Sequence, residues 1–315
     1  MPSFATEVKN ELARLMYDNN CCQRAELAAL LRMGASMTLW FGRTFGISFV
    51  TENAAVARKI LNLVKLVSEG NVGMEVSVRR HRRLNKSNSY HLRAAPSAQV
   101  KQLLTELGLM KGDSFNVGSD GDLLRKGCCR AAYLRGAFLG GGSINRPEAG
   151  SHFEFVTGSY AFAATLVSIL KKMGMPAGIM ERKSGYVIYV KESESIMDLM
   201  GIMEAEASLE EFEGAKNLKE LRNQVNRIVN CETANLQKTV KAAYKQVAAV
   251  QLLKEQGIFD GLPEGLKEAG NARIENPESS LKELSELLGV GRSGINHRLR
   301  RLEQLAKECK GDHEA

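Results

Sequence analysis

The amino-acid sequence predicts an α+β domain built from two copies of one unit, followed by an all-α module. Three observations lead to this prediction: an internal repeat in the first two thirds, the same order of helix-like and strand-like patterns in both copies, and two short amphipathic helices near the C-terminus. With 315 residues, 44% hydrophobic and 25% charged, the chain is long enough for two or three domains with separate cores.

The internal repeat appears when the sequence is displaced against itself by 107 residues. Residues 21–36 then align with 128–143 without a gap, and after one residue is dropped the triplet at 49–51 recurs at 155–157. Each copy is predicted to contain a helix of small residues, two strands, a longer amphipathic helix, two more strands and a final helix. We expect two halves related by a pseudo-twofold axis, each with an antiparallel sheet covered by helices on one face. The clearest patterns are those of the longer helices at 52–67 and 160–173 and the strands at 73–78, 90–94, 177–181 and 186–190.

The helices that open the two copies carry small residues at helical spacing. These are Ala28, Ala29 and Gly34 in the first helix and Gly136, Ala137 and Gly140 in the second. Small side chains let two helix backbones approach closely. This helix pair resembles the paired motif of single-chain LAGLIDADG homing endonucleases. The resemblance implies that the helices pack at the pseudo-twofold axis and that the two sheets form a saddle over DNA.

The acidic residue that those nucleases carry at the eighth motif position is missing from both copies. Gly34 and Gly141 occupy these positions, and Arg32 and Leu139 occupy the sixth. The nucleases need the carboxylates to hold divalent cations that activate water. No Asp or Glu lies in the motifs or directly after them. We therefore predict that the protein is not an enzyme.

Six cysteines occur as two adjacent pairs, at 21–22 and 128–129, and as the single residues Cys231 and Cys309. Adjacent cysteines bridge poorly and no signal-peptide pattern is present, so a reducing cytoplasm is expected. Four thiols near a symmetry axis suggest tetrahedral zinc, but structural zinc sites usually separate paired cysteines by two to four residues. Buried apolar cysteines at helix starts are the favoured interpretation. No metal and no cofactor are predicted.

The net charge of +7 is unevenly distributed. Segment 192–213 contains eight acids and no base, and it would repel duplex phosphates if it faced the DNA. We therefore expect the scaffold to bind DNA weakly, and the C-terminal module to supply specificity and most of the affinity. A strand-like segment offers auxiliary DNA contacts, although such runs are by default solvated faces: Arg79, Arg80, Arg82, Arg83 and Lys86.

A continuous helix is predicted from 216 to 254, with one apolar stripe and many amide side chains. Asn223 and Asn226 are further candidates for auxiliary DNA contacts, because amides can bind phosphates. A helical connector with a polar outer face explains them equally well.

Two short helices joined by a glycine turn at 289–291 follow. Ser280 and Glu283 have the spacing of a capping box at the start of the first helix. The second helix carries its apolar residues on one side and is basic on the other, which is the helix-turn-helix pattern. We expect this basic helix to contact base edges through Ser293, Asn296, His297 and Arg300, and phosphates through Arg292, Arg298 and Arg301. A basic helix that is merely exposed is the alternative.

Taken together, the motifs resemble those of the WhiA family over nearly the whole chain, at 21–32, 51–54, 133–143, 222–235 and 293–301. The resemblance implies a non-catalytic protein that binds double-stranded DNA and acts in cell division, chromosome segregation and, in sporulating actinobacteria, transcription. An iron–sulfur WhiB-type partner is expected only if the chain is actinobacterial. The implied location is cytoplasmic, at the nucleoid, and no apolar run is long enough for a membrane span. An active LAGLIDADG endonuclease and a structural adaptor without DNA affinity are the alternatives.

The expected domain organisation has five parts. These are a first LAGLIDADG-like half at 1–110, a second half at 111–215, a helical linker at 216–257, a helix-turn-helix DNA-binding domain at 258–309 and a disordered tail at 310–315.

Overall fold

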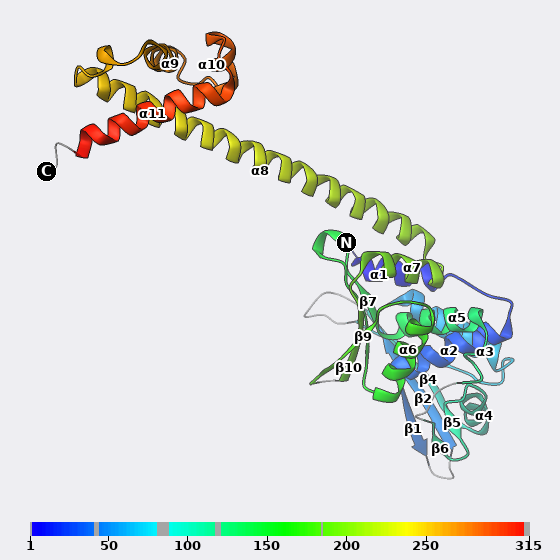
Figure 1. Ribbon diagram of the computed structural model, residues 1–315. Helices are drawn as coiled ribbons and strands as arrows, with labels where there is room; N and C mark the ends of the chain where they lie inside the picture. The colour runs from blue at the N-terminus through cyan, green and yellow to red at the C-terminus, as the bar shows by residue number, and fades with distance from the viewer. Residues whose placement is uncertain (1, 41–43, 81–87, 117–120, 184, 312–315) are drawn as a thin grey trace. The chain divides into compact units, whose positions relative to one another are not determined.

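The computed structural model of the chain describes residues 2–40, 44–80, 88–116, 121–183 and 185–311. The chain forms two compact units, divided between Glu220 and Leu221 (Figure 1). Each unit is described by itself. Among the described residues, no helix is both long enough and apolar enough to cross a lipid bilayer.

The first unit contains two copies of the same series of elements, which confirms the predicted α+β duplication. The first copy consists of α2 (Asn20–Gly34), β1 (Ala35–Trp40), β2 (Thr44–Thr51), α3 (Ala54–Val67), β3 (Glu75–Arg80), β4 (Asn88–Ser97) and α4 (Ala98–Glu106). The second consists of α5 (Gly127–Gly141), β7 (Gly142–Ile144), β8 (Phe153–Thr157), α6 (Tyr160–Lys172), β9 (Gly178–Arg182), β10 (Gly185–Val190) and α7 (Ser193–Met203). The other elements are α1 (Phe4–Leu12), the hairpin of β5 (Met110–Lys111) and β6 (Ser114–Phe115), and a 3-10 turn at Pro147–Ala149.

The two sheets have equivalent topologies. Their strand orders are β1-β2-β4-β3 and β7-β8-β10-β9, with every neighbouring pair antiparallel. The repeat extends to the caps of α3 and α6. Asn53 and Ser159 each accept a hydrogen bond from a backbone N–H of the first helical turn. Their own backbone N–H groups donate to the hydroxyls of Thr51 and Thr157, at 3.1 and 3.3 Å.

Each sheet turns one face toward the helices and leaves the other open. Phe49 and Leu92 lie opposite each other and are buried, whereas the adjacent Val50 is 52% exposed. In the second sheet, Phe153 stacks on Phe138 of α5, with ring centroids 5.2 Å apart. Alternation along a strand therefore separates the core face from the open face.

The helices α2 and α5 pack side by side at the centre of the first unit (Figure 1). A Cβ atom on Gly136 would lie 2.1 Å from the carbonyl oxygen of Glu26, and one on Gly140 would lie 2.6 Å from the Cβ of Met33. Only glycine fits at these two points, because any side chain would push the helices apart. The close helix approach predicted from the small residues is confirmed.

The acidic segment 192–213 forms α7 and the start of α8 (Glu206–Glu255), and α7 belongs to the helical layer. Its residues Ile196, Leu199, Met200 and Met203 are fully buried, and it packs against α5. The segment therefore does not line the open faces of the sheets. Repulsion of a duplex was expected only if this segment faced the DNA, and the packing of α7 against α5 does not meet that condition for a duplex lying over the sheets.

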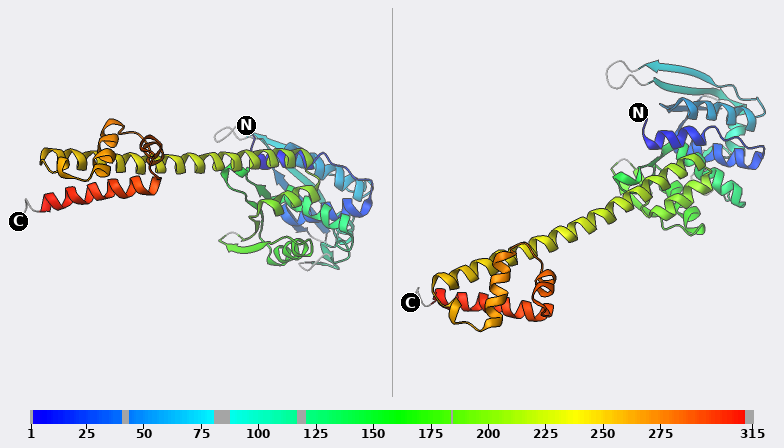
Figure 2. Two further views of the ribbon diagram at one scale, coloured as in Figure 1. Left: turned by 45° about the horizontal axis from the view of Figure 1, so that its top comes forward. Right: turned by 90° about the horizontal axis from the view of Figure 1, so that it is seen from above.

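The second unit is all-helical and consists of the later part of α8 together with α9 (Glu264–Glu275), α10 (Leu281–Leu288) and α11 (Arg292–Gly311), with a 3-10 turn at Phe259–Gly261. Figure 2 shows the three shorter helices gathered around the end of α8. The apolar core of this unit is formed by Ala249, Val250, Leu253, Phe259, Ala269, Ala272, Leu284, Ile295, Leu299, Leu302 and Ala306. The last part of the expected linker thus packs into the C-terminal core, since Val250 and Leu253 are completely buried. Residues 310 and 311 continue α11, whereas 312–315 of the expected tail lie outside the described residues.

Candidate DNA-binding surface

The first helix of the predicted helix-turn-helix begins at a fully formed capping box. The Ser280 hydroxyl accepts a hydrogen bond from the backbone N–H of Glu283 at 3.3 Å. The Glu283 carboxylate accepts one from the backbone N–H of Ser280 at 2.6 Å. This second bond favours the charged carboxylate and so lowers the pKa of Glu283. The capping box predicted from the sequence is confirmed.

The turn between α10 and α11 depends on Gly289. Its φ of 60° lies in the left-handed region that glycine adopts without strain. Its backbone N–H and that of Val290 both donate to the carbonyl of Ser285, which ends α10. The N–H of Ile295 donates to the carbonyl of Gly291 at 3.1 Å, so α11 begins directly after Gly291.

One face of α11 is fixed in the core and the opposite face is exposed. Ile295, Leu299 and Leu302 are at most 1% exposed. The exposed face carries the side chains predicted to meet DNA, namely Ser293, His297, Arg300 and Arg301. Their exposure is confirmed, and their contact with DNA stays a prediction.

The other three predicted contacts have different environments. Arg292 is exposed at the first position of α11, whereas Asn296 is half-buried. Arg298 is also half-buried, and its guanidinium lies 3.5 Å from the carboxylate of Glu268 on α9. Part of the charge of Arg298 is therefore already neutralised within the protein, which makes it a weaker candidate for a phosphate than Arg292.

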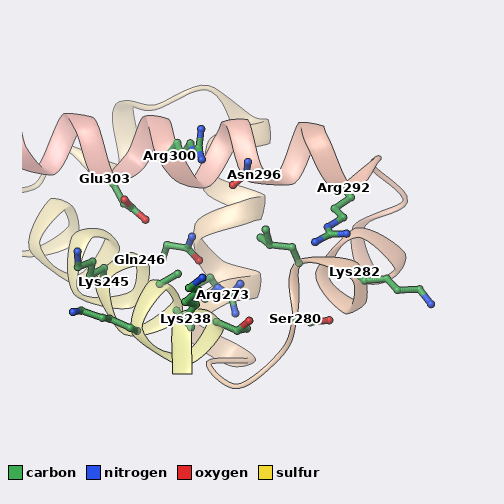
Figure 3. Close-up of a pocket in the computed structure, with 15 residues that line it drawn as sticks. Lys238, Lys245, Gln246, Arg273, Ser280, Lys282, Arg292, Asn296, Arg300 and Glu303 are labelled. Carbon is green, nitrogen blue, oxygen red and sulfur yellow. The ribbon is translucent and has the colours of Figure 1, made fainter. Parts of the chain in front are cut away.

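A basic cleft of about 600 Å³ lies between the later part of α8 and the start of α11 (Figure 3). We define the basic cleft by its charged lining residues, seven cations and one acid: Lys238, Lys241, Lys245, Arg273, Lys282, Arg292, Arg300 and Glu303. Asn296 also lines it. Three of the predicted DNA contacts on α11 therefore also line the basic cleft, namely Arg292, Asn296 and Arg300.

Two buried polar side chains, Gln246 and Arg273, lie between the helices in this cleft (Figure 3). Arg273 donates to the carbonyls of Ser279 and Asn276, at 2.6 and 3.4 Å, and so fixes the loop before α10. Burial without a carboxylate partner lowers the pKa of Arg273. The Arg273 Nε and the Gln246 Oε1 have no hydrogen-bond partner among the described residues. Such groups favour a polar occupant of the cleft.

Three lysines that α8 contributes to the basic cleft are not among the predicted DNA contacts. Lys238, Lys241 and Lys245 follow one another at the spacing of one helical face. No acid occurs between Glu232 and Glu255. This acid-free basic face was the signal that would have revealed them.

The auxiliary positions are only partly described. In β3, Arg79 pairs with Ser89 and Arg80 with Asn88, so the two arginines point to opposite faces of the sheet. By the register, Arg79 lies on the open face. Arg82, Arg83 and Lys86 lie outside the described residues. Asn223 and Asn226 are exposed on α8, which fits either interpretation of them.

At the eighth motif positions, Gly34 and Gly141, neighbouring side chains fill the space that a side chain would need. A Cβ atom on Gly34 would lie 2.7 Å from the ring of Phe49, and one on Gly141 would lie 2.7 Å from the Cγ of Met33. Arg32, at the sixth motif position, donates to the carbonyls of Gly108 and Asn116 at 3.1 and 2.8 Å. These positions therefore have a structural role in holding the fold around the central helices.

A buried charge network lies between the central helices, and sequence reasoning missed it. The Glu26 carboxylate lies 3.2 Å from the Nζ of Lys59 and 3.3 Å from the Nε of Arg135, and all three side chains are at most 1% exposed. Arg135 also donates to the carbonyl of Met203 at 3.0 Å and stacks on Tyr17. Burial raises the pKa of Glu26 and lowers that of Lys59.

The structure also brings the two cysteine pairs together. The Sγ atoms of Cys21, Cys22, Cys128 and Cys129 all lie within 4.8 Å of one another. The four thiols therefore converge although the cysteines of each pair are adjacent in sequence, contrary to the prediction from their spacing. Each pair begins one of the two central helices, and the helix crossing supplies the proximity that the sequence spacing lacks.

The fold and this surface together define a class of protein, in which a duplicated LAGLIDADG-like domain is joined to a helix-turn-helix module. Models of the WhiA N-terminal LAGLIDADG-like domain, the WhiA LAGLIDADG-like domain and the WhiA C-terminal HTH domain match residues 20–110, 130–222 and 225–306. The chain is 44% identical to the "Probable cell division protein WhiA" of Desulforamulus reducens, over 99% of this chain and 98% of that protein. It is also 44% identical to the protein of the same name from Heliobacterium modesticaldum, over 97% and 96%. The chain belongs to the WhiA family.

Solved structures support the fold. The chain resembles the full-length DUF199/WhiA from Thermatoga maritima with a TM-score of 0.60 at 24% identity, covering 98% of this chain and 99% of that one. Its first unit resembles the N-terminal LAGLIDADG domain of DUF199/WhiA with a TM-score of 0.51 at 21% identity, covering 64% and 91%.

Proposed function

We propose that the protein binds double-stranded DNA through α11 and the basic cleft, does not cut it, and acts as a regulator of bacterial cell division, chromosome segregation or transcription. The regulatory role is supported by the name of its relatives, probable cell division proteins, and by the match to the WhiA HTH domain. We propose a cytoplasmic, nucleoid-associated location on the same basis.

The observation that carries the proposal is the two-sided character of α11. Its apolar side is buried in the core through Ile295, Leu299 and Leu302. The orientation of the opposite side is therefore fixed in the protein without DNA. A fixed helix with exposed polar and basic side chains is suited to the major groove. Ser293, His297 and Arg300 are the proposed base contacts, with Asn296 at their edge.

The basic cleft is proposed to hold the phosphate backbone beside the groove. Its cations outnumber its single acid, Glu303, and two of them, Arg292 and Arg300, come from the recognition helix itself. Phosphate contacts position a protein on DNA and provide most of the salt-dependent affinity. The C-terminal unit would therefore supply both specificity and most of the binding energy.

Fluorescence anisotropy with labelled genomic duplexes, repeated over a series of salt concentrations, tests this proposal. Replacing Lys238, Lys241 and Lys245 by alanine should weaken binding to all duplexes and reduce the slope of log K against log salt by about 0.9 for each lost phosphate contact. Arg300→Ala should cost about 1–3 kcal/mol on a selected site and relax its sequence preference. Lys171→Ala with Lys172→Ala, which removes two exposed lysines from α6 of the first unit, is the control and should leave both quantities unchanged.

Unchanged affinity in the cleft and α11 variants would refute the proposed surface. Point substitutions are preferable to deletion after Gly257, because deletion would expose Val250 and Leu253 of the C-terminal core. No measurable DNA affinity in the wild-type protein would favour a structural adaptor instead.

The absence of cleavage is proposed from the motif helices. Carboxylates at the eighth positions hold the cations in the nucleases, and the corresponding Gly34 and Gly141 are packed against Phe49 and Met33. Incubation of supercoiled plasmid with the purified protein and Mg²⁺ should yield no nicked or linear product. Magnesium-dependent cleavage that co-purifies with the protein would establish the nuclease alternative.

A further inference from the structure

The four cysteines at the start of α2 and α5 form the only group of three or more candidate metal ligands among the described residues. Cys21 and Cys22 are the second and third residues of α2, and Cys128 and Cys129 hold the same places in α5. Each repeat thus contributes two thiols to one cluster at the same end of the central helix pair.

The geometry of the cluster is close to that of a tetrahedral metal–sulfur site. Four sulfurs bound to one zinc ion at about 2.3 Å lie about 3.8 Å from one another. Here all four Sγ atoms lie within 4.8 Å, and those of Cys128 and Cys129 are 4.0 Å apart. A disulfide needs about 2.05 Å, and all four cysteines are free. The Sγ atoms therefore need to approach one another by about 1 Å or less to reach the spacing of a zinc site.

The charges around the cluster are positive. Both helix N-termini direct their positive ends at the cluster, and neither helix has an acid in its first turn. Arg24, Lys126 and Arg130 flank the cysteines in sequence. These charges offset the two negative charges that remain when four thiolates bind one divalent cation.

Two of the four cysteines are buried and two are accessible to solvent. Cys22 and Cys129 are 3% and 4% exposed. Cys21 is half-buried and Cys128 exposed, which leaves an entry path from solvent.

We propose that Cys21, Cys22, Cys128 and Cys129 bind one Zn²⁺ ion that joins the two repeats. Binding releases four protons and forms four Zn–S bonds, with no change of oxidation state. Four soft ligands in a tetrahedron select zinc over magnesium or calcium, which prefer oxygen. With all four positions occupied by protein, the site is structural and not catalytic.

The test uses the full-length protein purified anaerobically with a reductant. Zinc analysis should find one ion per chain after incubation with zinc and removal of the excess. Replacement by Co²⁺ should give a sulfur-to-cobalt charge-transfer band and the intense visible bands of a tetrahedral site. Zinc should also raise the melting temperature, because it binds only the folded cluster.

Matched variants assign the metal to the cluster. Cys21→Ser with Cys128→Ser, at the two more accessible positions, should abolish the stoichiometric metal and the cobalt spectrum. Cys231→Ser with Cys309→Ser removes the same number of thiols elsewhere and should retain both. If the first variant fails to fold, the cobalt spectrum of the control variant decides. A wild-type chain without stoichiometric zinc, or a cluster found as disulfides under these reducing conditions, would overturn the proposal.

Discussion

Substitution of Gly136 by alanine tests the close contact between the two central helices. In an open helical position, Gly→Ala stabilises a protein by about 1 kcal/mol. At Gly136 the added Cβ would lie 2.1 Å from the carbonyl oxygen of Glu26, which belongs to the backbone of the facing helix. A rotamer change does not relieve this clash, so the helices must separate by more than 1 Å, given an ordinary contact distance of about 3.5 Å.

The expected cost follows from two contributions. Overpacking of a tight core costs about 1–3 kcal/mol, and occasionally more. Helix separation also stretches the buried pair of Glu26 and Arg135, now 3.3 Å apart, and the loss of a buried charge partner costs about 3–5 kcal/mol. The clash places the overpacking cost near the upper end of its range, and part of the ion-pair energy is lost as well. After subtraction of the about 1 kcal/mol that alanine contributes to helix stability, the net destabilisation is about 3 kcal/mol or more.

The measurement is hydrogen exchange of peptides from α2 and α5, combined with urea unfolding followed by circular dichroism. Hydrogen exchange reports on the first unit alone, which separates the effect from unfolding of the second. Gly214→Ala is the matched control, because Gly214 lies in α8 within the same unit and a Cβ added there would have no atom of a neighbouring element within 4 Å. It should stabilise by up to about 1 kcal/mol. If both substitutions shift stability in the same direction, the inferred backbone contact is wrong.

Two further predictions concern buried charges in the first unit. Glu26→Gln leaves Lys59 and Arg135 facing a neutral amide and should lower the free energy of unfolding by about 3–5 kcal/mol. As a control, Glu7→Gln affects an exposed pair with Arg146. It should lower the free energy of unfolding by less than about 1 kcal/mol in the same urea titration. Burial lowers the pKa of Lys9 to about 8. Between pH 8 and the unfolded pKa near 10.4, the unfolded chain binds more protons than the folded one. The free energy of unfolding should therefore rise with pH across that interval, by at most about 3 kcal/mol. Lys9→Met should remove the rise, and an unchanged pH profile would contradict the assigned burial.

The repeat and the periodicity were sufficient to predict the architecture. The offset of 107 residues predicted two equivalent series of elements, and α3 and α6 begin and end within two residues of the predicted limits. The capping box of α10 was equally accessible, because Ser280 and Glu283 act on neighbouring backbone groups. Patterns of this kind encode local structure, in which partners are a few residues apart.

The features that escaped prediction depend on contacts between elements. Helical periodicity indicates which residues share one face, but not which other helix that face meets. The convergence of Cys22 with Cys128, the buried pairing of Glu26 with Arg135, and the cleft between Lys241 and Arg292 all join residues at least 50 positions apart. The side of the sheet on which the acidic α7 packs was left open for the same reason.

The charges between the central helices also make the two repeats unequal partners. At the positions equivalent to Glu26 and Arg135, the opposite repeat carries Tyr133 and Ala28. If two second repeats from different chains paired, two arginines would meet in the interior with no Glu26 to neutralise them, at a large desolvation cost. The second repeat in its present form is thereby unsuited to pair with a copy of itself, and it depends on the first repeat for the carboxylate that neutralises Arg135.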